Sequence, residues 1–352
     1  MTDPILSVDN LEVTYRMNDS PDIRAVSDCS FDITSGEYFG LVGESGCGKS
    51  TVAKAIIGAL DDNGEITGGE IRFNGEPIHE YSELEYRHDL RWTDIAVIPQ
   101  ASMNSLDPVT KISDQAIEIG QAHTGRSAGE LRERLVDLFE VVGLSESRID
   151  DYPHQFSGGM EQRAVIAFAL LLEPSLIIAD EPTTALDVIM QDEILGHFDD
   201  IKDGDFSMLM ITHDMSVVLE NCDSMAVLHA GQTAESGSVA AIHDDPRHPY
   251  TKLLQEAFPD IRAPNQELME IPGNPPELTD EVDYCTFVDR CPWSVEECRQ
   301  GAPPLEEVDG DSTHCSSCIR SDESHEFDVR DVEEYTFQKG PRQPATDGGD
   351  EE

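Results

Sequence analysis

The segment GESGCGKST, at residues 43–51, is the strongest indicator of fold in this chain of 352 residues. It fits the pattern G-x-x-x-x-G-K-[ST], follows the apolar run YFGLV at 38–42 and precedes a helical pattern at 51–60. In that setting, glycines let successive backbone N–H groups converge on phosphate oxygens at a helix N-terminus. Lys49 is placed to reach the β and γ phosphates, and the Ser50 hydroxyl to reach Mg²⁺. The predicted nucleotide-binding residues are Gly43, Glu44, Ser45, Gly46, Cys47, Gly48, Lys49, Ser50 and Thr51.

Two further motifs follow the phosphate loop. In LIIADEP, at 176–182, an apolar strand ends in Asp180, which is suited to the Mg²⁺ shell, and in Glu181, which is suited to polarise an attacking water. FSGGMEQ, at 156–162, places Ser-Gly-Gly at the start of an apolar helix and offers a second phosphate cradle. One nucleotide does not need two cradles from one chain, so we expect the second to serve the nucleotide of a facing partner.

Strand and helix patterns alternate from Ile5 to about Ala241. Continuous apolar runs are typical of buried strands in a parallel sheet. We predict an α/β fold, with strands at 5–15, 38–42, 176–179, 208–212 and 225–228 and helices at 51–60, 116–120, 129–142 and 159–172.

The charge balance is strongly acidic. The chain has 23 Lys and Arg against 72 Asp and Glu, for a formal net charge of −49. Such a surface disfavours nucleic acid as a partner, and molar salt would screen its self-repulsion. We interpret the acidity as that of a salt-in halophile; an acidic mesophilic protein, or one that binds cations, is the alternative. No apolar run has the length of a membrane span and no signal peptide is visible, so we expect a cytoplasmic chain.

The motifs in this order resemble the ATPase subunit of an ATP-binding cassette (ABC) transporter, over about Leu6 to Gly237. The resemblance implies a P-loop NTPase core with a parallel-sheet RecA-like subdomain, an antiparallel β subdomain and a helical signature subdomain. It assigns the ATPase domain to 1–245, with the helical part at about 101–172. A small Cys-rich C-terminal extension would follow at 246–320, and an acidic, disordered tail at 321–352.

The same resemblance implies residue roles. Tyr15 would stack on adenine, although a plain strand aromatic is the alternative. Gln100 in VIPQ would contact Mg²⁺ and the water, and His213 in ITHD the γ-phosphate, although a lone His after a strand is often structural. Asp187 in TTALD would couple the two sites of a dimer. The signature facing the opposite nucleotide would comprise Ser157, Gly158, Gly159 and Gln162.

One residue of the signature departs from the family pattern. Glu161 stands where many members carry a basic residue. Two explanations remain open, halophilic substitution and weaker phosphate attraction across the dimer.

RHPYTKLLQEAFP at 247–259 and IPGNPPEL at 271–278 resemble the oligopeptide/dipeptide importer branch. With the acidity, this suggests a halophilic archaeon. The branch implies a membrane-peripheral ATPase on the cytoplasmic face, two sandwiched ATP molecules with Mg²⁺, and hydrolysis coupled to import. The implied partners are a second homologous ATPase subunit (or a second copy of this chain), two permeases and an extracellular solute-binding protein. Import of nickel or a sugar, a soluble ABC ATPase and an idle partner subunit are the alternatives.

Five of the eight cysteines cluster near the C-terminus. Cytoplasmic thiols at this density suit a soft metal or an iron–sulfur cluster, and the pattern resembles a [4Fe–4S] site of the peptide-importer branch. Zinc and free thiols are the alternatives. Cys318 is a spare or an alternative fourth ligand, while Cys29, Cys47 and Cys222 fit small buried side chains. The expected ligands are Cys285, Cys291, Cys298 and Cys315.

Overall fold

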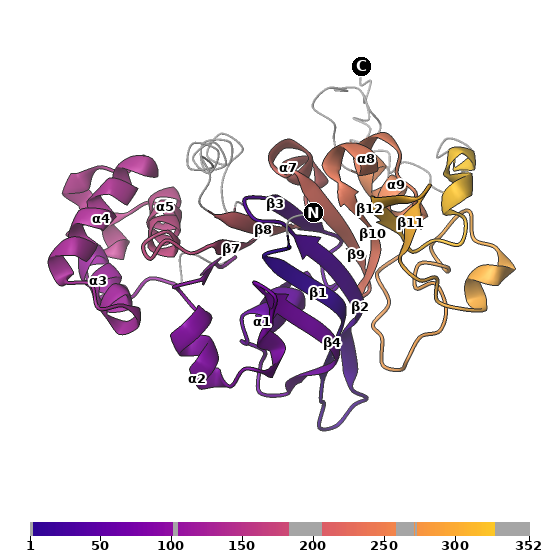
Figure 1. The fold of residues 1–352 in the computed structure, drawn as a ribbon, viewed down its shortest axis with the longest axis horizontal. Helices are drawn as coiled ribbons and strands as arrows, with labels where there is room; N and C mark the ends of the chain where they lie inside the picture. The colour runs from indigo at the N-terminus through magenta and orange to yellow at the C-terminus, as the bar shows by residue number, and fades with distance from the viewer. Residues whose placement is uncertain (1–2, 101–104, 183–205, 258–270, 272, 328–352) are drawn as a thin grey trace, which may run out of the picture.

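The computed structural model describes residues 3–100, 105–182, 206–257, 271 and 273–327 (Figure 1). Its strands form a twelve-stranded sheet in the order β5-β4-β1-β2-β10-β9-β3-β8-β7-β6, with β11 and β12 off this path. The sheet has an antiparallel part and a parallel part, which meet where β2 and β10 pair through Asp28 and Gln232. This is the mixed architecture of the predicted α/β fold.

The antiparallel part consists of β1 (Leu6–Tyr15), β2 (Ile23–Ile33), β4 (Gly64–Phe73) and β5 (Glu76–Pro77). The parallel part consists of β3 (Tyr38–Val42), β6 (Ile95–Ile98), β7 (Leu176–Asp180), β8 (Ser207–Thr212) and β9 (Ser224–His229). Every residue of β3 and β8 is buried, as expected for strands covered on both faces. β10 (Gln232–Ser238) runs antiparallel to β9.

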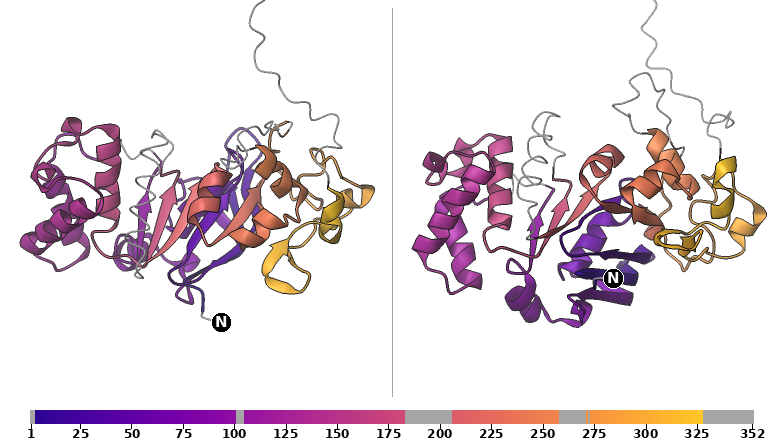
Figure 2. Two further views of the ribbon diagram at one scale, coloured as in Figure 1. Left: turned by 90° about the horizontal axis from the view of Figure 1, so that it is seen from above. Right: turned by 45° about the horizontal axis from the view of Figure 1, so that its top comes forward.

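A group of three helices stands at one end of the molecule (Figures 1 and 2). It contains α3 (Ile112–His123), α4 (Ala128–Val141) and α5 (Gly158–Ala169). Ser127 and Glu130 form a capping box that fixes the start of α4. The apolar face predicted for α4 is its buried face, and it comprises Leu131, Leu135, Leu138 and Phe139.

The other helices within the described ranges are short. They are α1 (Lys49–Ile56), α2 (Glu83–Glu85), α7 (Met215–Asn221), α8 (Val239–Asp244) and α9 (Pro249–Ala257). The 3₁₀ turns are Ile78–Glu80, Glu146–Arg148, Pro153–Gln155, Glu296–Arg299 and Ser321–Glu326, and Tyr86–Leu90 is a π-turn. α1 ends four residues earlier than the pattern at 51–60 predicts, because Gly58 takes φ +60° after the helix.

The C-terminal region adds a strand to the core sheet. β12 (Asp311–Ser316) pairs with β11 (Glu306–Val308) and also, antiparallel, with β10. Tyr250, Leu253 and Phe287 pack in one hydrophobic cluster with Val42 of β3 and Met225 of β9. The described part of the expected extension therefore shares its core with the ATPase fold.

The first residues of the expected disordered tail, at 321–327, are packed on the fold. Ser321–Glu326 forms a 3₁₀ turn, and the Phe327 side chain is buried against Trp293, with ring centroids 5.1 Å apart. An aromatic anchor in the acidic stretch holds this segment to the fold. Residues 328–352 lie outside the described part of the chain.

Candidate functional site

The phosphate loop joins β3 to α1, as the motif requires. Gly48 caps α1 at φ +108°, a conformation that L side chains rarely adopt. A Cβ on Gly48 would lie 2.5 Å from the Ala25 carbonyl oxygen, and one on Gly43 would lie 2.2 Å from the Leu228 carbonyl oxygen. The loop backbone is thus pressed against its neighbours at positions where only glycine fits.

The ammonium of Lys49 is buried inside this loop. Its Nζ donates to the Gly43 carbonyl at 2.7 Å and to the Glu44 carbonyl at 2.9 Å. Cys47, which lies between Glu44 and Lys49 in the sequence, is buried, and burial raises the pKa of its thiol. Cys47 is therefore a packing residue, and Lys49 is the cation that the loop presents.

A hydroxyl and a carboxylate meet beside the loop. Ser50 Oγ donates to Asp180 Oδ1 at 3.4 Å, joining the first turn of α1 to the end of β7. Burial raises the pKa of Asp180, and the neighbouring Glu181 charge acts in the same direction, while the Ser50 hydrogen bond opposes it. Hydroxyl and carboxylate oxygens are ligands that Mg²⁺ prefers, so this corner fits the cation of a nucleotide.

Three predicted catalytic residues come together at the ends of neighbouring parallel strands. Gln100 Nε2 donates to Glu181 Oε2 at 2.6 Å, and His213 Nδ1 lies 3.0 Å from Glu181 Oε1. Glu181 takes φ +47°, and its backbone N–H donates to the Ile211 carbonyl at 2.8 Å. Because β6, β7 and β8 are adjacent and parallel, the residues that follow them converge at one edge of the sheet.

Tyr15 closes β1 in the antiparallel part of the sheet. It pairs with Gly64 of β4, where an added Cβ would lie 2.9 Å from the Tyr15 ring. Lys54 of α1 has a raised pKa, mainly through its hydrogen bond from Nζ to Asp61, with smaller contributions from Tyr15 and Asp180. The adenine-stacking role of Tyr15 stays a prediction.

The signature begins α5. Ser157 Oγ accepts a hydrogen bond from Met160 N, which caps the helix, while Gln162 is buried and burial raises the pKa of Glu161. α5 stands in the helical group, apart from α1 (Figure 1). The chain does not bring its own signature to its own phosphate loop. Asp187 lies outside the described residues.

Four cysteines line one pocket near the C-terminus: Cys285, Cys291, Cys298 and Cys318. Burial raises the pKa of Cys291 to about 12, with further contributions from the other three cysteines. Burial likewise raises the pKa of Cys318 to about 12, and Cys285 and Cys298 contribute. These thiols are therefore neighbours, in a pocket that also holds Phe287, Trp293 and Phe327.

Cys315, the expected fourth ligand, does not line this pocket. It lies in β12, opposite Ser236, and its pKa is raised by burial and then by the carboxylates of Glu307 and Asp311. His314 and Ser316 on either side are buried, so strand alternation turns Cys315 the other way. The structure thus groups Cys318, the alternative fourth ligand of the sequence analysis, with Cys285, Cys291 and Cys298 in place of Cys315. Among the described residues, no three Cys, His, Asp or Glu side chains stand close enough to hold a metal ion.

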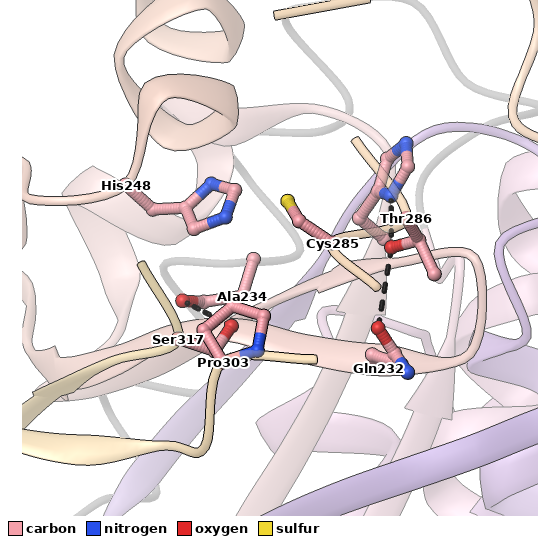
Figure 3. A pocket seen from close by; sticks show the side chains of 8 residues that line it. Gln232, Ala234, His248, Cys285, Thr286, Pro303 and Ser317 are labelled. Carbon is pink, nitrogen blue, oxygen red and sulfur yellow. Dashed lines mark hydrogen bonds between the residues drawn. The ribbon is translucent and has the colours of Figure 1, made fainter. Parts of the chain in front are cut away.

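A second pocket adjoins the cysteines (Figure 3). His248 and Cys285 face each other across it, and Thr286 donates to Gln232 Oε1 at 3.2 Å. Burial lowers the pKa of His248 to about 3, and burial followed by the Arg290 charge lowers that of His229 to about 3. Both imidazoles are therefore neutral, and they fill this region as structural groups.

Sequence reasoning missed three residues that the structure places at functional positions. Arg290 and Tyr250 contact Glu44 of the phosphate loop, and the buried Glu235 accepts hydrogen bonds from Arg247 N, His248 N and His314 Nε2. Arginine inside the cysteine run CTFVDRCP was the available signal for the first. No helix among the described residues is long and apolar enough to cross a membrane.

Comparison with known proteins places these features in a family. A family model described as ABC transporter matches residues 26–184, and one described as the C-terminal region of oligopeptide/dipeptide transporters matches residues 234–298. An oligopeptide transport ATP-binding protein of Salmonella typhimurium is 43% identical over 305 residues, covering 86% of this chain and 90% of its own length. A dipeptide transport ATP-binding protein of Bacillus subtilis is 40% identical over 329 residues, covering 92% and 97%. A solved dimeric ATP-binding cassette bound to ADP and Pi has a TM-score of 0.58 at 28% identity, covering 66% of this chain and 98% of that one.

Proposed function

Because this chain belongs to the family of ATP-binding subunits of oligopeptide and dipeptide ABC transporters, we propose that it hydrolyses ATP to power import of di- and oligopeptides. The observation that carries the ATPase assignment is the contact of Glu181 with both Gln100 and His213, beside an intact phosphate loop. The match of residues 234–298 to the C-terminal region of peptide transporters supports the peptide substrate.

Hydrolysis follows from the placement of these groups. The loop N–H groups and Lys49 bind the phosphates, and Mg²⁺, which neutralises phosphate charge when bound, would be held by Ser50, Asp180 and Gln100. Glu181 orients the attacking water and His213 contacts the γ-phosphate. Catalysis consists mainly of positioning and of stabilising charge in a site that excludes bulk water.

The working unit is a dimer of cassettes. Ser157, Gly158, Gly159 and Gln162 stand apart from the loop of their own chain, which supports their service to the nucleotide of a facing cassette. ATP binding closes the dimer and hydrolysis reopens it, a ligand-biased two-state element. In this proposal Asp187 couples the two sites, Tyr15 stacks on adenine, and the complex contains a second ATPase, two permeases and an extracellular solute-binding protein. The chain then acts at the cytoplasmic face of the membrane.

The test is purification of the tagged chain from solubilised native membranes in molar KCl, followed by mass spectrometry. Recovery of two permeases and a second, similar ATPase supports the proposal, and the solute-binding protein encoded or recovered with them can be screened against peptides, nickel and sugars. Recovery with ribosomal or DNA-associated partners, under conditions that preserve other membrane complexes, overturns it.

The cysteine pocket suits a [4Fe–4S] cluster in its donor chemistry alone, because among the described residues its thiols are not gathered closely enough to hold a metal ion without rearrangement. Four neighbouring thiols in a largely apolar pocket are the ligand set that such a cluster requires, and Cys285, Cys291, Cys298 and Cys318 would hold it. A bound cluster would cross-link the segment that carries Cys285 to the turn that follows β12, in a region with few regular elements.

The acidity supports a salt-in halophilic source, in line with an archaeal origin. Asp9 illustrates the physical cost of this composition, because burial and then the neighbouring Asp32 and Glu70 charges raise its pKa. Like charges gathered on one face of the antiparallel sheet destabilise the fold unless salt screens them.

A further inference from the structure

Arg290, in the C-terminal segment, forms a bidentate ion pair with Glu44 of the phosphate loop. Arg290 Nη1 donates to Glu44 Oε2 and Nη2 donates to Glu44 Oε1, each at 2.7 Å. The Arg290 side chain is 8% exposed and that of Glu44 is 22% exposed. A bidentate pair with this little solvent is geometrically specific and is screened far less by salt than a surface pair.

Through Glu44, this ion pair is connected to Lys49, the cation proposed to bind phosphate. The Glu44 carbonyl accepts hydrogen bonds from Lys49 Nζ at 2.9 Å and from Cys47 N at 3.3 Å. The Glu44 N–H donates to the Tyr250 hydroxyl of α9 at 3.0 Å. The residue that carries the Arg290 pair is therefore one of the two whose carbonyls orient Lys49, the other being Gly43.

Two ring side chains contact the Arg290 guanidinium as well. Its guanidinium lies 5.6 Å from the centre of the buried Phe287 ring. Its Nη1 also lies 3.2 Å from Nε2 of His229. Since His229 is neutral, Nε2 accepts this hydrogen bond and Nδ1 donates to Thr286 Oγ1 at 3.0 Å. Thr286 in turn donates to Gln232, as Figure 3 shows.

The pair also has an electrostatic role. Glu44 places a carboxylate in the loop that must receive the phosphates of ATP. Arg290 compensates that charge, so its removal leaves a partly buried, unpaired carboxylate in the loop proposed to bind an anionic ligand. The ion pair between Arg290 and Glu44 thus affects both the geometry and the charge of the phosphate loop.

We propose that Arg290 is a positioning residue for ATP, through which the C-terminal segment sets the nucleotide affinity of the phosphate loop. The proposal rests on ATP binding as the proposed function. It makes the peptide-transporter region part of the nucleotide site, in addition to whatever it contributes to assembly or to metal binding.

The test compares nucleotide binding and turnover in the full chain at a salt concentration that keeps it folded. Arg290→Gln should raise the Kd for ATP and the KM by about tenfold, a typical effect of losing hydrogen bonds to a charged group, with kcat within about twofold of the parent. Adding Glu44→Gln to Arg290→Gln should restore the Kd to within about threefold of the parent, because the uncompensated charge is gone.

The matched control is Arg299→Gln. Arg299 is in the same C-terminal segment and pairs with Asp289, but that pair is exposed and does not touch the loop. It should leave Kd, KM and kcat unchanged. If Arg290→Gln unfolds, Arg290→Lys takes its place, because lysine keeps the charge but not the two parallel hydrogen bonds to Glu44. The proposal then expects a raised Kd for ATP and faster exchange of the 43–50 amides than in Arg299→Gln, and parental values of both in folded Arg290→Lys overturn it.

Hydrogen exchange of the 43–50 amides, measured without nucleotide, separates this proposal from the proposed function. Faster exchange in Arg290→Gln than in Arg299→Gln supports positioning even if the chain binds no ATP. A folded Arg290→Gln with parental Kd and parental exchange overturns the inference while leaving the ATPase assignment intact, and so does a double variant that binds ATP no better than Arg290→Gln. A parent that binds no ATP overturns the proposed function instead.

Discussion

The Gln100 amide nitrogen and a Glu181 carboxylate oxygen lie 2.6 Å apart, although 81 residues separate them in sequence. With His213 at the other oxygen, both sides of this carboxylate have a partner. Its orientation is therefore fixed before a nucleotide arrives. In the proposed mechanism, a water that Glu181 orients would compete with Gln100 and His213 for the same carboxylate oxygens.

Glu181→Gln should abolish turnover and leave ATP binding intact. The amide keeps the size of the side chain but removes the charge that orients water, so kcat should fall by about 100-fold or more. The variant should accumulate as an ATP-bound dimer, seen by size-exclusion chromatography alongside a phosphate-release assay. Glu140→Gln on the exposed face of α4 is the control. Unchanged ATPase activity in Glu181→Gln would sink the catalytic assignment.

Asp180→Asn and Ser50→Ala should weaken the dependence on Mg²⁺ more than the binding of nucleotide itself. Both remove oxygen ligands from the corner where Ser50 Oγ lies 3.4 Å from Asp180 Oδ1. Titration of ATPase activity with Mg²⁺ should show an apparent affinity about tenfold lower, and the ATP affinity in EDTA should be near that of the parent. Equal losses of ATP affinity with and without Mg²⁺ would show that Ser50 and Asp180 do not bind the cation and have only a structural role.

Cys318→Ser should lose a bound cluster, and Cys315→Ser should keep it. Cys318 lines the pocket with the other three thiols, whereas Cys315 is turned away in β12. The measurement is iron, sulfide and zinc content with visible absorbance after anaerobic purification. The opposite pattern would restore Cys315 as the ligand, and zinc without sulfide would replace the cluster by a metal ion.

Acid should destabilise the fold through its buried histidines. The pKa of His248 is about 3 in the folded chain and about 6.5 when unfolded, so the unfolded state binds the extra proton as the pH falls. Stability is then lost between about pH 6.5 and pH 3, by about 1.4 kcal/mol per pH unit for each such histidine.

His248→Asn keeps an acceptor for the Tyr250 N–H and removes the titration. The free energy of unfolding, measured with urea at pH 6.5, 5.5 and 4.5, should fall less steeply with decreasing pH in His248→Asn than in the parent. The difference should be about 1.4 kcal/mol per pH unit. The exposed His154→Asn is the control. Parallel slopes in the parent and His248→Asn would show that His248 is charged in the folded chain.

Salt should be required for folding. At a net charge of −49, the carboxylates of the chain repel one another in dilute buffer. Salt screens this repulsion, because the Debye length shortens from about 10 Å at 0.1 M to about 3 Å at 1 M. The far-UV circular dichroism should show unfolding on dilution from 3 M to 0.1 M KCl. An unchanged spectrum counts against the halophilic interpretation.

The sequence was most informative where a contact is local or where strands end together. The apolar run at 38–42 became β3 with the same bounds, since continuous burial leaves little ambiguity. Gln100, Glu181 and His213 could be grouped because each follows a strand of a parallel sheet. That grouping rested on the family resemblance as well as on strand patterns.

Other features depend on distances that no local pattern encodes. Cys315 and Cys318 have similar surroundings in sequence, and only the register of β12 decides which one reaches the pocket. Glu44 and Arg290 are 246 residues apart, and in a chain with 72 acidic residues a complementary charge identifies no particular partner.

The pairing of β10 with β12 has a consequence for the order of events during synthesis. The buried Glu235 carboxylate on β10 receives a hydrogen bond from His314, which is made 79 residues later. At about 5–20 residues per second, the ribosome delivers that partner about 4–16 s after Glu235 itself. During that interval the nascent cassette has an open strand edge beside an incompletely paired carboxylate, so the ATPase core is completed only after the C-terminal strand has left the ribosome.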